Sequence, residues 1–515
     1  MSSLSTTEVA FAASTEKYLE LIGHLELPES HSMTHSDLEN LLSGEGRELM
    51  RRLMEDHLRI RACGDDVWKS VTGSDGIERT HKILRERTVM TVFGKVRIKR
   101  TGYSRPGKSS LFPLDAVLNL PEGIHSYGIR KALALEVSKS SFSEATDSIR
   151  RQTGVRMHKR QAEHLSRKAV RCFDEYYEQT CSLLPGEAEK LPLLILTTDG
   201  KGIVVRKEDL REETRKKAEN ARRKLNKRIS KGEKKNRKRM ATVASVYHME
   251  RFVRSPESVA GEFAPESESE KKGRPRPVAK RVWASLEKSR EDVIREIFEE
   301  ALRRDPSNSK KWVCLVDGDP HQLKSVNRQI EKFSVSAVVI LDIIHVIEYL
   351  WKAARVFHDE ASRTSEKWVS ERLLGILRGR ASLVAGGMRR SATLLKIRRS
   401  SRKPVDVCAD YLLKNSPYLR YNEYLGEGLP IATGVIEGAC RHLIRDRMDI
   451  TGARWSLEGA EAVLKLRSLR SSGDFDDYWK FYELQEFDRN HYSKYSDPAI
   501  LDELSSKEFV EGKST

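Results

Sequence analysis

The sequence has few cysteines and no cysteine pattern typical of a metal or disulfide site. Six cysteines occur in 515 residues, none in a Cys-x-x-Cys pair, so we predict neither a zinc site nor a disulfide framework. No run of about 18 apolar residues occurs, and the first residues lack the basic and apolar regions of a signal peptide. Glycine-rich nucleotide-binding motifs and the Gly-x-Ser-x-Gly motif are missing too. We therefore expect a cytoplasmic protein without a membrane partner and without ATP-driven or acyl-transfer chemistry.

Basic residues are in excess and unevenly distributed. The 93 Lys and Arg outnumber the 76 Asp and Glu, which gives a net charge of +17. Residues 206–239 contain 17 basic and 6 acidic residues, so 17 − 6 = +11 of that charge lies in this one tract. Clustered positive charge indicates a polyanionic partner, although a solvated basic surface is the alternative. We expect the end of the tract to contact DNA phosphates, with Lys234, Lys235, Arg237, Lys238 and Arg239.

Three stretches each place one acidic residue where a metal-dependent DNA-cleaving enzyme needs it. Two apolar runs, 191–199 and 312–317, end on an aspartate followed by glycine, Asp199 and Asp317. In the third stretch Glu437 opens a helical pattern that also carries Arg441 and Arg445, which we expect to contact DNA. Carboxylates on neighbouring strands and a packed helix can hold two Mg²⁺ or Mn²⁺ ions, and such a pair cleaves phosphodiesters. Asp199, Asp317 and Glu437 are therefore predicted to be both catalytic and metal-binding.

Other acidic residues compete for these roles. Asp319 is two residues from Asp317, Asp342 also ends an apolar strand, and Glu423 and Glu427 are weaker rivals to Glu437. An aspartate before glycine is common in turns, so each motif alone is weak evidence. The pair Asp342-x-x-His345 is compatible with a metal site, a DNA contact or a buried hydrogen-bonded pair, and we favour the last. Asp342, His345 and Asp319 are therefore treated as accessory candidates.

The second half of the chain is predicted to be an α/β core. Strands are expected at 191–199, 240–247, 312–316 and 336–341, with helices at 284–304 and 321–333 and a disordered loop at 255–280. This order is that of an RNase H-like catalytic core over 190–350. A helical insertion over 351–430 precedes the catalytic glutamate, and 431–475 complete the core. Residues 476–515 read as a polar tail.

The first part of the chain is predicted to bind DNA. Residues 1–125 are expected to be helical with one basic β-hairpin, in which Gly94-Lys95 forms the turn. Val96 and Ile98 alternate there with basic residues, which suits either a ribbon on phosphates or a solvated face. Residues 126–185 have the order of a helix-turn-helix, with Gly154 in the turn, although an ordinary helical hairpin has the same pattern. The second helix presents Lys159, Arg160, Arg167 and Lys168.

Ordered motifs over roughly 40–475 resemble the DDE-type insertion-sequence transposases of the ISKra group, related to the Mutator-like superfamily. In the first half the matching segments are 91–100, Leu-Phe-Pro-Leu-Asp (111–115), 143–155 and Thr-Asp-Gly-Lys-Gly (198–202). In the second half they are Val-Asp-Gly (316–318), Leu-Asp-Ile-Ile-His (341–345), 349–352, 429–431 and Thr-Gly-Val-Ile-Glu (433–437). Arg-Met (447–448), Gly-Ala-Arg-Trp (452–455), 459–460 and 464–467 complete a long ordered block.

This resemblance implies a DNA transposase that cuts the ends of a mobile element and joins them to target double-stranded DNA with Mg²⁺ or Mn²⁺. Asp199, Asp317 and Glu437 would be its acidic triad, and Asp342 and His345 would match an accompanying Asp/Cys-x-x-His signature. The class implies a homo-oligomer in the synaptic complex and association with the nucleoid. The sequence departs from the family between 101 and 110, which contains no cysteine knuckle. Alternatives are a non-catalytic, decayed or domesticated DNA-binding protein and an RNase H-like nuclease.

Overall fold

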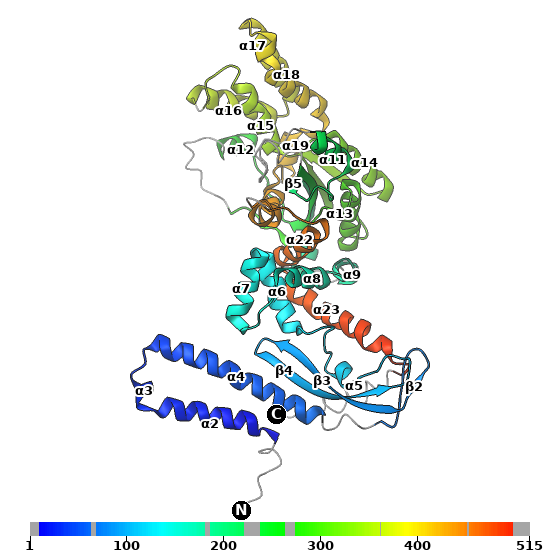
Figure 1. Ribbon diagram of the computed structural model, residues 1–515. Coiled ribbons are helices and arrows are strands. Elements are labelled where there is room, and N and C mark those ends of the chain that lie inside the picture. Colours follow the sequence, from blue (N-terminus) through cyan, green and yellow to red (C-terminus); the bar gives the residue numbers. More distant parts are fainter. Residues whose placement is uncertain are drawn as a thin grey trace, which may run out of the picture. The chain divides into compact units, whose positions relative to one another are not determined.

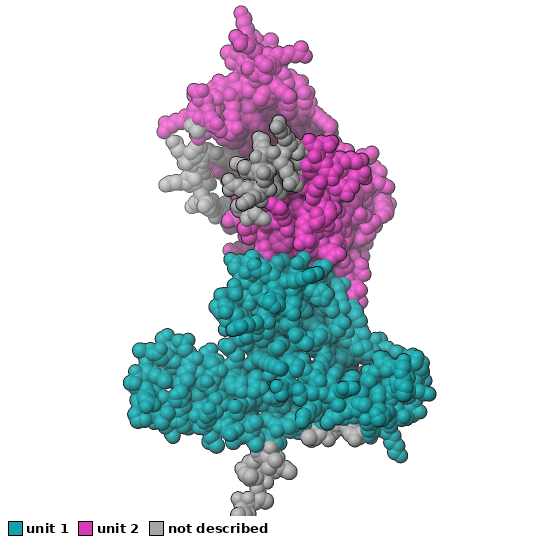
Figure 2. Space-filling model, in the orientation of Figure 1, with its two compact units in different colours: residues 1–173, 475–515 teal, residues 174–474 magenta. Residues whose placement is uncertain are grey.

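The computed structural model describes residues 10–62, 68–180, 186–220, 237–262, 273–360, 362–450 and 453–497. The chain forms two units, one of residues 1–173 with 475–515 and one of residues 174–474 (Figures 1 and 2). The predicted segments 1–125 and 126–185 thus fall largely in one unit, and 190–350, 351–430 and 431–475 in the other. The described residues contain no helix long and apolar enough to cross a membrane.

The N-terminal unit begins with helices and a long β-hairpin. Helices α2 (Ala12–Glu26), α3 (Pro28–His31) and α4 (His35–Ala62) precede the small strand pair β1 (Val71–Thr72) and β2 (Glu78–Arg79). The hairpin consists of β3 (His81–Thr91) and β4 (Gly94–Ser104), followed by α5 (Pro113–Val117). Val96 and Ile98 are buried in one cluster with Leu58 of α4 and Leu114 of α5. The predicted alternation of β4 is therefore confirmed, and helices cover its apolar face.

The turn of this hairpin differs from the prediction. Thr91 pairs with Gly94, so Val92 and Phe93 form the two-residue loop and Gly94 begins β4. Gly94 has a φ of 120°, in the region that favours glycine. The hydroxyl of Thr91 also accepts a hydrogen bond from the Phe93 amide and donates to the Gly94 carbonyl. The turn therefore lies two residues before the predicted Gly94-Lys95, and these hydrogen bonds stabilise it there.

Three helices follow in this unit: α6 (Tyr127–Lys139), α7 (Phe142–Thr153) and α8 (Lys159–Ala169). Ser141 and Glu144 form a reciprocal capping box at the start of α7, and Gly154 ends it with a φ of 75°. The predicted order of helix, glycine turn and basic helix is therefore present. Contact with DNA stays a prediction.

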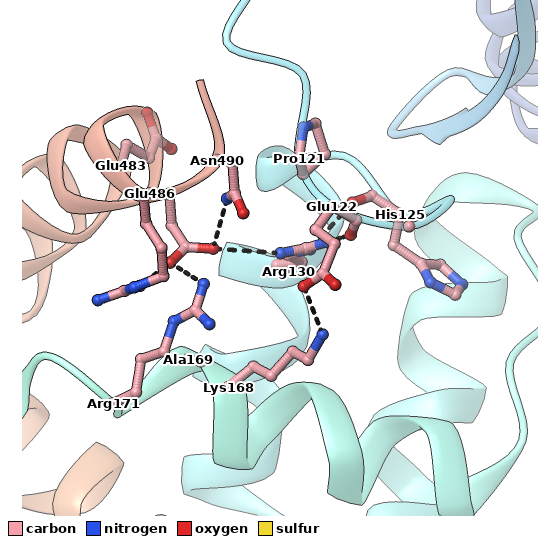
Figure 3. A network of polar contacts seen from close by, with 12 residues as sticks. Pro121, Glu122, His125, Arg130, Lys168, Ala169, Arg171, Glu483, Glu486 and Asn490 are labelled. Carbon is pink, nitrogen blue, oxygen red and sulfur yellow. Dashed lines mark hydrogen bonds and ion pairs between the residues drawn. The ribbon is translucent and has the colours of Figure 1, made fainter. Parts of the chain in front are cut away.

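The segment predicted to be a polar tail is a buried helix over much of its length. Helix α23 spans Phe475–Asn490 and a short 3₁₀ turn spans Tyr492–Lys494. The side chains of Phe475, Tyr478, Trp479 and Tyr482 are buried, and the Tyr478 hydroxyl donates a hydrogen bond to the Ala169 carbonyl at 2.6 Å. Glu486 is also buried and forms ion pairs with three arginines, Arg130 and Arg171 (Figure 3) and Arg489. The tail prediction was wrong for 476–490 because alternating polar residues masked the helical spacing of the aromatics.

The C-terminal unit is built on a five-stranded mixed sheet in the order β7-β6-β5-β8-β9. The strands are β5 (Leu193–Val204), β6 (Lys238–Met249), β7 (Val278–Ser285), β8 (Lys311–Val316) and β9 (Ala337–Leu341). Neighbours β5 and β6, like β6 and β7, are antiparallel, whereas β5–β8 and β8–β9 are parallel. Their residues are largely buried because helices cover the sheet.

Two expectations for this sheet are corrected. β5 continues five residues beyond Asp199, because Asp199 to Val204 remain paired with β6. The loop expected at 255–280 contains helix α12 (Pro256–Glu262) and the start of β7, which extends to Ser285. Helix α13 accordingly begins at Arg290, not at 284, and ends at Arg304.

The remaining elements of this unit are helical. They include α9 (Phe173–Thr180), at whose start this unit begins, α10 (Gly186–Lys190), α11 (Glu212–Asn220) and α14 (Pro320–Phe333). Helix α15 (Ile343–Ala354) follows β9, and the predicted helical insertion is present as α16 (Arg363–Leu377), α17 (Ala381–Leu394), α18 (Arg399–Lys414) and α19 (Tyr421–Gly426). The chain then forms α20 (Gly434–Ala439), the π-helical turn η3 (Cys440–Arg445), α21 (Asp446–Met448) and α22 (Leu457–Ser472). α15 and α18 pack on each other, as do α22 and β7.

Candidate active site

Asp199 lies in β5, and Asp317 directly follows the adjacent parallel strand β8. Thr197 of β5 pairs with Leu315 of β8, and each aspartate follows two residues later. Residues opposite each other in parallel strands lie on the same face of the sheet, and neighbouring strands are about 4.8 Å apart. Both aspartates are half-buried, and neither forms an ion pair with Lys or Arg in the part of the chain described. The register of β5 and β8 therefore brings the backbones of both aspartates to neighbouring positions at one end of β8.

Gln322 joins the two segments that carry these aspartates. Its Oε1 accepts a hydrogen bond from the Asp317 amide at 3.0 Å, and its Nε2 donates to the Thr198 carbonyl at 2.8 Å. The side chain is 3% exposed. A buried amide with both ends bonded fixes the distance between the two backbones. Sequence reasoning missed Gln322, since nothing in the helix pattern of α14 indicates a partner more than a hundred residues away.

Asp319, the alternative candidate to Asp317, caps the N-terminus of helix α14. Its carboxylate accepts hydrogen bonds from the amides of His321 and Gln322 at the start of α14 and pairs with Arg290 at 3.1 Å. Burial opposes ionisation, but these partners outweigh it and lower the pKa of Asp319. The Asp319 amide in turn donates to Asp317 Oδ1 at 2.8 Å. Asp319 therefore helps to orient Asp317, which is the better placed of the two to bind a cation.

Glu437 lies in α20, which packs against β5 and β6. One turn further, the Cys440 thiol donates a hydrogen bond to Asp199 Oδ2 at 3.1 Å. Burial, with the charges of Asp199 and Glu437, raises the pKa of Cys440. The charge of Glu437 therefore acts on the Cys440 thiol, which contacts Asp199. The exposed Arg441 and Arg445 lie on the π-helical turn that follows, a feature frequent at functional sites.

Asp342 is a buried helix cap. Its carboxylate accepts hydrogen bonds from the Ile344 amide at 3.0 Å and from the hydroxyl of Thr433. Burial raises the pKa of Asp342, and its hydrogen bonds only partly offset this. The half-exposed His345 lies 3.8 Å from Glu348. The favoured hypothesis, a buried hydrogen-bonded pair of Asp342 and His345, is therefore wrong: Asp342 is buried, but its side-chain partner is Thr433.

Asp199 and Asp317 fit a hard divalent cation. Mg²⁺ takes oxygen ligands and keeps several waters, so one or two protein carboxylates suffice. Within the described ranges, no three His, Cys, Asp or Glu side chains come together as a ligand set. Glu437 is exposed, and its place in a single metal site with the two aspartates stays a prediction.

The basic residues predicted to bind DNA lie in different environments. Lys234 and Lys235 fall outside the described residues. Arg239 differs from the prediction, because its guanidinium donates to the carbonyls of Leu286 and Asp209 at 2.8 and 3.0 Å. Its pairing in β6 directs it into the protein, so it stabilises the fold. Arg237 and Lys238 are half-buried, and Lys238 lies 3.9 Å from Asp449.

The four predicted residues of α8 remain at the surface. Lys159, Arg160 and Arg167 are exposed, and Lys168 is partly exposed and paired with Glu122 at 2.8 Å. Glycine ends the preceding helix and the buried Ala162, Leu165 and Ala169 hold α8 against its unit. The basic side chains of α8 therefore project from a helix that is fixed by its own buried residues.

Comparisons with known proteins give a distant structural similarity. No protein-family model matches the sequence. No curated protein matches it either. A solved structure described as a Drosophila P element transposase strand transfer complex is similar at a TM-score of 0.23 and 10% identity, over 74% of this chain and 84% of that one. A similarity of this size carries no argument about fold or activity.

Proposed function

We propose that this protein is a DNA transposase of an insertion sequence, which cuts the ends of its element and joins them to target DNA. The observation that carries the proposal is the position of Asp199 in β5 and of Asp317 directly after the adjacent parallel strand β8, with Gln322 bonded to the backbone of both segments. Glu437 is the third acidic residue of the proposed site. It follows Asp199 and Asp317 in the chain, it lies on helix α20, which packs against β5, and its charge helps to raise the pKa of Cys440, which contacts Asp199. The ordered motifs shared with the ISKra group point the same way.

The proposal includes an RNase H-like core. Its support is the order of the sheet, in which an antiparallel meander of β5, β6 and β7 is extended at β5 by the parallel strands β8 and β9. Carboxylates on the adjacent first and fourth strands, with a later helix against the sheet, are what such a core requires. The helical segment α16–α19 lies between β9 and Glu437 in the sequence, where we expected an insertion.

Each acidic residue has a role in this proposal. Asp199 and Asp317 would hold Mg²⁺ or Mn²⁺, which when bound activates the attacking oxygen and stabilises the leaving one. Asp319 and Gln322 orient Asp317, and the Cys440 thiol orients Asp199. Asp342 has a structural role, because its carboxylate accepts hydrogen bonds from Ile344 and Thr433 and caps α15. The net charge of +17 suits a double-stranded DNA substrate, and a homo-oligomer would be needed to hold two ends together.

A strand-transfer assay distinguishes the candidate functions. Purified protein is incubated with labelled DNA from the ends of the element that encodes it, a target plasmid and Mg²⁺ or Mn²⁺. Joined products support the transposase. Clean cutting without joining would indicate a nuclease, and sequence-specific binding with no product in either metal would indicate a non-catalytic DNA-binding protein. Inverted repeats flanking the gene define the DNA to be tested.

A further inference from the structure

A cavity of about 800 Å³ lies in the N-terminal unit beside helix α8. One wall is α8, with Arg160, His164, Arg167 and Lys168, and the other is the segment before α6, with Ile124 and His125. Figure 3 shows Glu122 and His125 of this segment opposite Lys168. A cavity of this size holds small ligands or part of a larger one. The charged face of α8 thus forms one side of a cleft.

The charge of the cleft is suited to an anion. Of the residues that line it in the described structure, four are Arg or Lys, three are His and Glu122 alone is acidic; Arg130 is buried, and the other three Arg and Lys lie on α8. The Ile124 side chain is 47% exposed, so an apolar surface lies beside the cationic one. Cationic side chains with adjacent apolar surface match a nucleic-acid strand, whose anionic phosphates alternate with apolar sugar faces.

Glu122 forms an ion pair with one of these cations, Lys168. Its Oε2 accepts a hydrogen bond from Lys168 Nζ at 2.8 Å, and the two side chains are 59% and 27% exposed. The hydrogen bond and charge of Lys168 lower the pKa of Glu122, which therefore stays ionised. An exposed pair of this kind contributes little to stability, so a competing anion displaces it at small cost.

The backbone of the same segment is fixed by a buried arginine. Arg130 donates to the His125 carbonyl at 3.0 Å and to the Glu122 carbonyl, and its side chain is 3% exposed. The carboxylate of Glu486 lies 4.0 Å from this guanidinium (Figure 3). The wall of the cleft is therefore held in place while the Glu122 side chain is free to turn into solvent.

We propose that this cleft is a binding site for a DNA strand. The Glu122 carboxylate pairs with Lys168 until a backbone phosphate of the DNA replaces that carboxylate. Lys168 and Arg160 would contact phosphate oxygens, and the exposed Ile124 would contact the sugar. The inference rests on the proposed function, because it takes DNA as the substrate. It adds that an acidic side chain of the protein itself competes with that DNA.

The test measures binding of a short, end-labelled, mixed-sequence DNA duplex to the full-length protein by fluorescence anisotropy across a salt series. Glu122→Ala is expected to lower Kd about two- to fivefold, the range expected for releasing one exposed ion pair. The matched control is Glu136→Ala, which removes an equal charge from a Lys139 ion pair on α6 of the same unit. It should change Kd by less than about twofold, because salt screens charges remote from the DNA.

Lys168→Ala completes a double-mutant cycle. It should weaken binding and reduce the salt slope by about one phosphate contact, and Glu122→Ala should then have no further effect in that background. The cleft proposal is overturned if Glu122→Ala binds no tighter than wild type, matches Glu136→Ala, or acts equally without Lys168. Those outcomes leave the proposed function standing if wild type binds DNA, whereas a wild-type protein that binds no DNA contradicts both.

Discussion

Removal of the Gln322 side chain tests whether a buried bridge holds the two aspartate-bearing segments together. Gln322→Ala deletes a bond to the Asp317 amide and a bond to the Thr198 carbonyl, and leaves both backbone groups unsatisfied. Each buried unsatisfied group costs about 1–3 kcal/mol. We therefore expect the free energy of unfolding to fall by roughly 2–6 kcal/mol more than loss of side-chain volume alone explains, measured by urea denaturation with circular dichroism.

The same helix supplies the control for volume. Gln329 of α14 is 4% exposed, and its Oε1 has no hydrogen-bond partner among the described residues. Gln329→Ala therefore removes an identical side chain without breaking a bond at that oxygen. Equal losses of stability in the two variants would refute the bridge. DNA joining, assayed where both variants are folded, should fall only in Gln322→Ala, because only that variant releases the Asp317 segment.

Two further predictions concern buried ionisable groups. Burial, and then the charges of Arg304 and Lys310, lower the pKa of His248 to about 4 from 6.5, so between these values the unfolded chain binds more protons and stability falls as pH falls. In pH-dependent urea unfolding, wild type should lose about 3 kcal/mol over this window, and His248→Leu should lack that loss; parallel pH profiles would contradict it. Glu486→Gln leaves three arginines without their shared carboxylate and should lower the unfolding free energy by at least about 2 kcal/mol. An unchanged melting temperature would exclude this role.

Much of the sheet could be predicted from local sequence. The apolar runs that form β8 and β9 are buried on both faces, so their composition alone indicates strands. The end of β5 could not be predicted, because Gly200, Lys201 and Gly202 have no strand pattern and are extended only by pairing with β6. β7 was missed for a related reason: it follows a polar, proline-rich stretch and becomes a strand through its contact with β6.

The tail contained a signal that sequence reasoning overlooked. Phe475, Tyr478, Trp479 and Tyr482 recur at helical spacing, and Glu486 continues the same face. Their burial requires α6 and the end of α8 as partners, which sequence spacing does not reveal. The candidate site shows the same limit, since Asp199 and Asp317 stood out as strand-end carboxylates, whereas Gln322, Thr433 and Cys440 act through contacts that only the fold creates.

The central claim is that Asp199 and Asp317 form one site for joining DNA. The most direct measurement is strand transfer of element-end DNA in Mg²⁺ by wild type, Asp199→Asn, Asp317→Asn and the control Glu371→Gln, an exposed acid of the same unit paired with Arg372. Groups that merely orient a metal ligand already cost about 10- to 100-fold when changed. We predict losses beyond about 100-fold for both aspartate variants, with folding and DNA binding retained, and wild-type activity for Glu371→Gln. Joining activity retained by either aspartate variant would contradict the account.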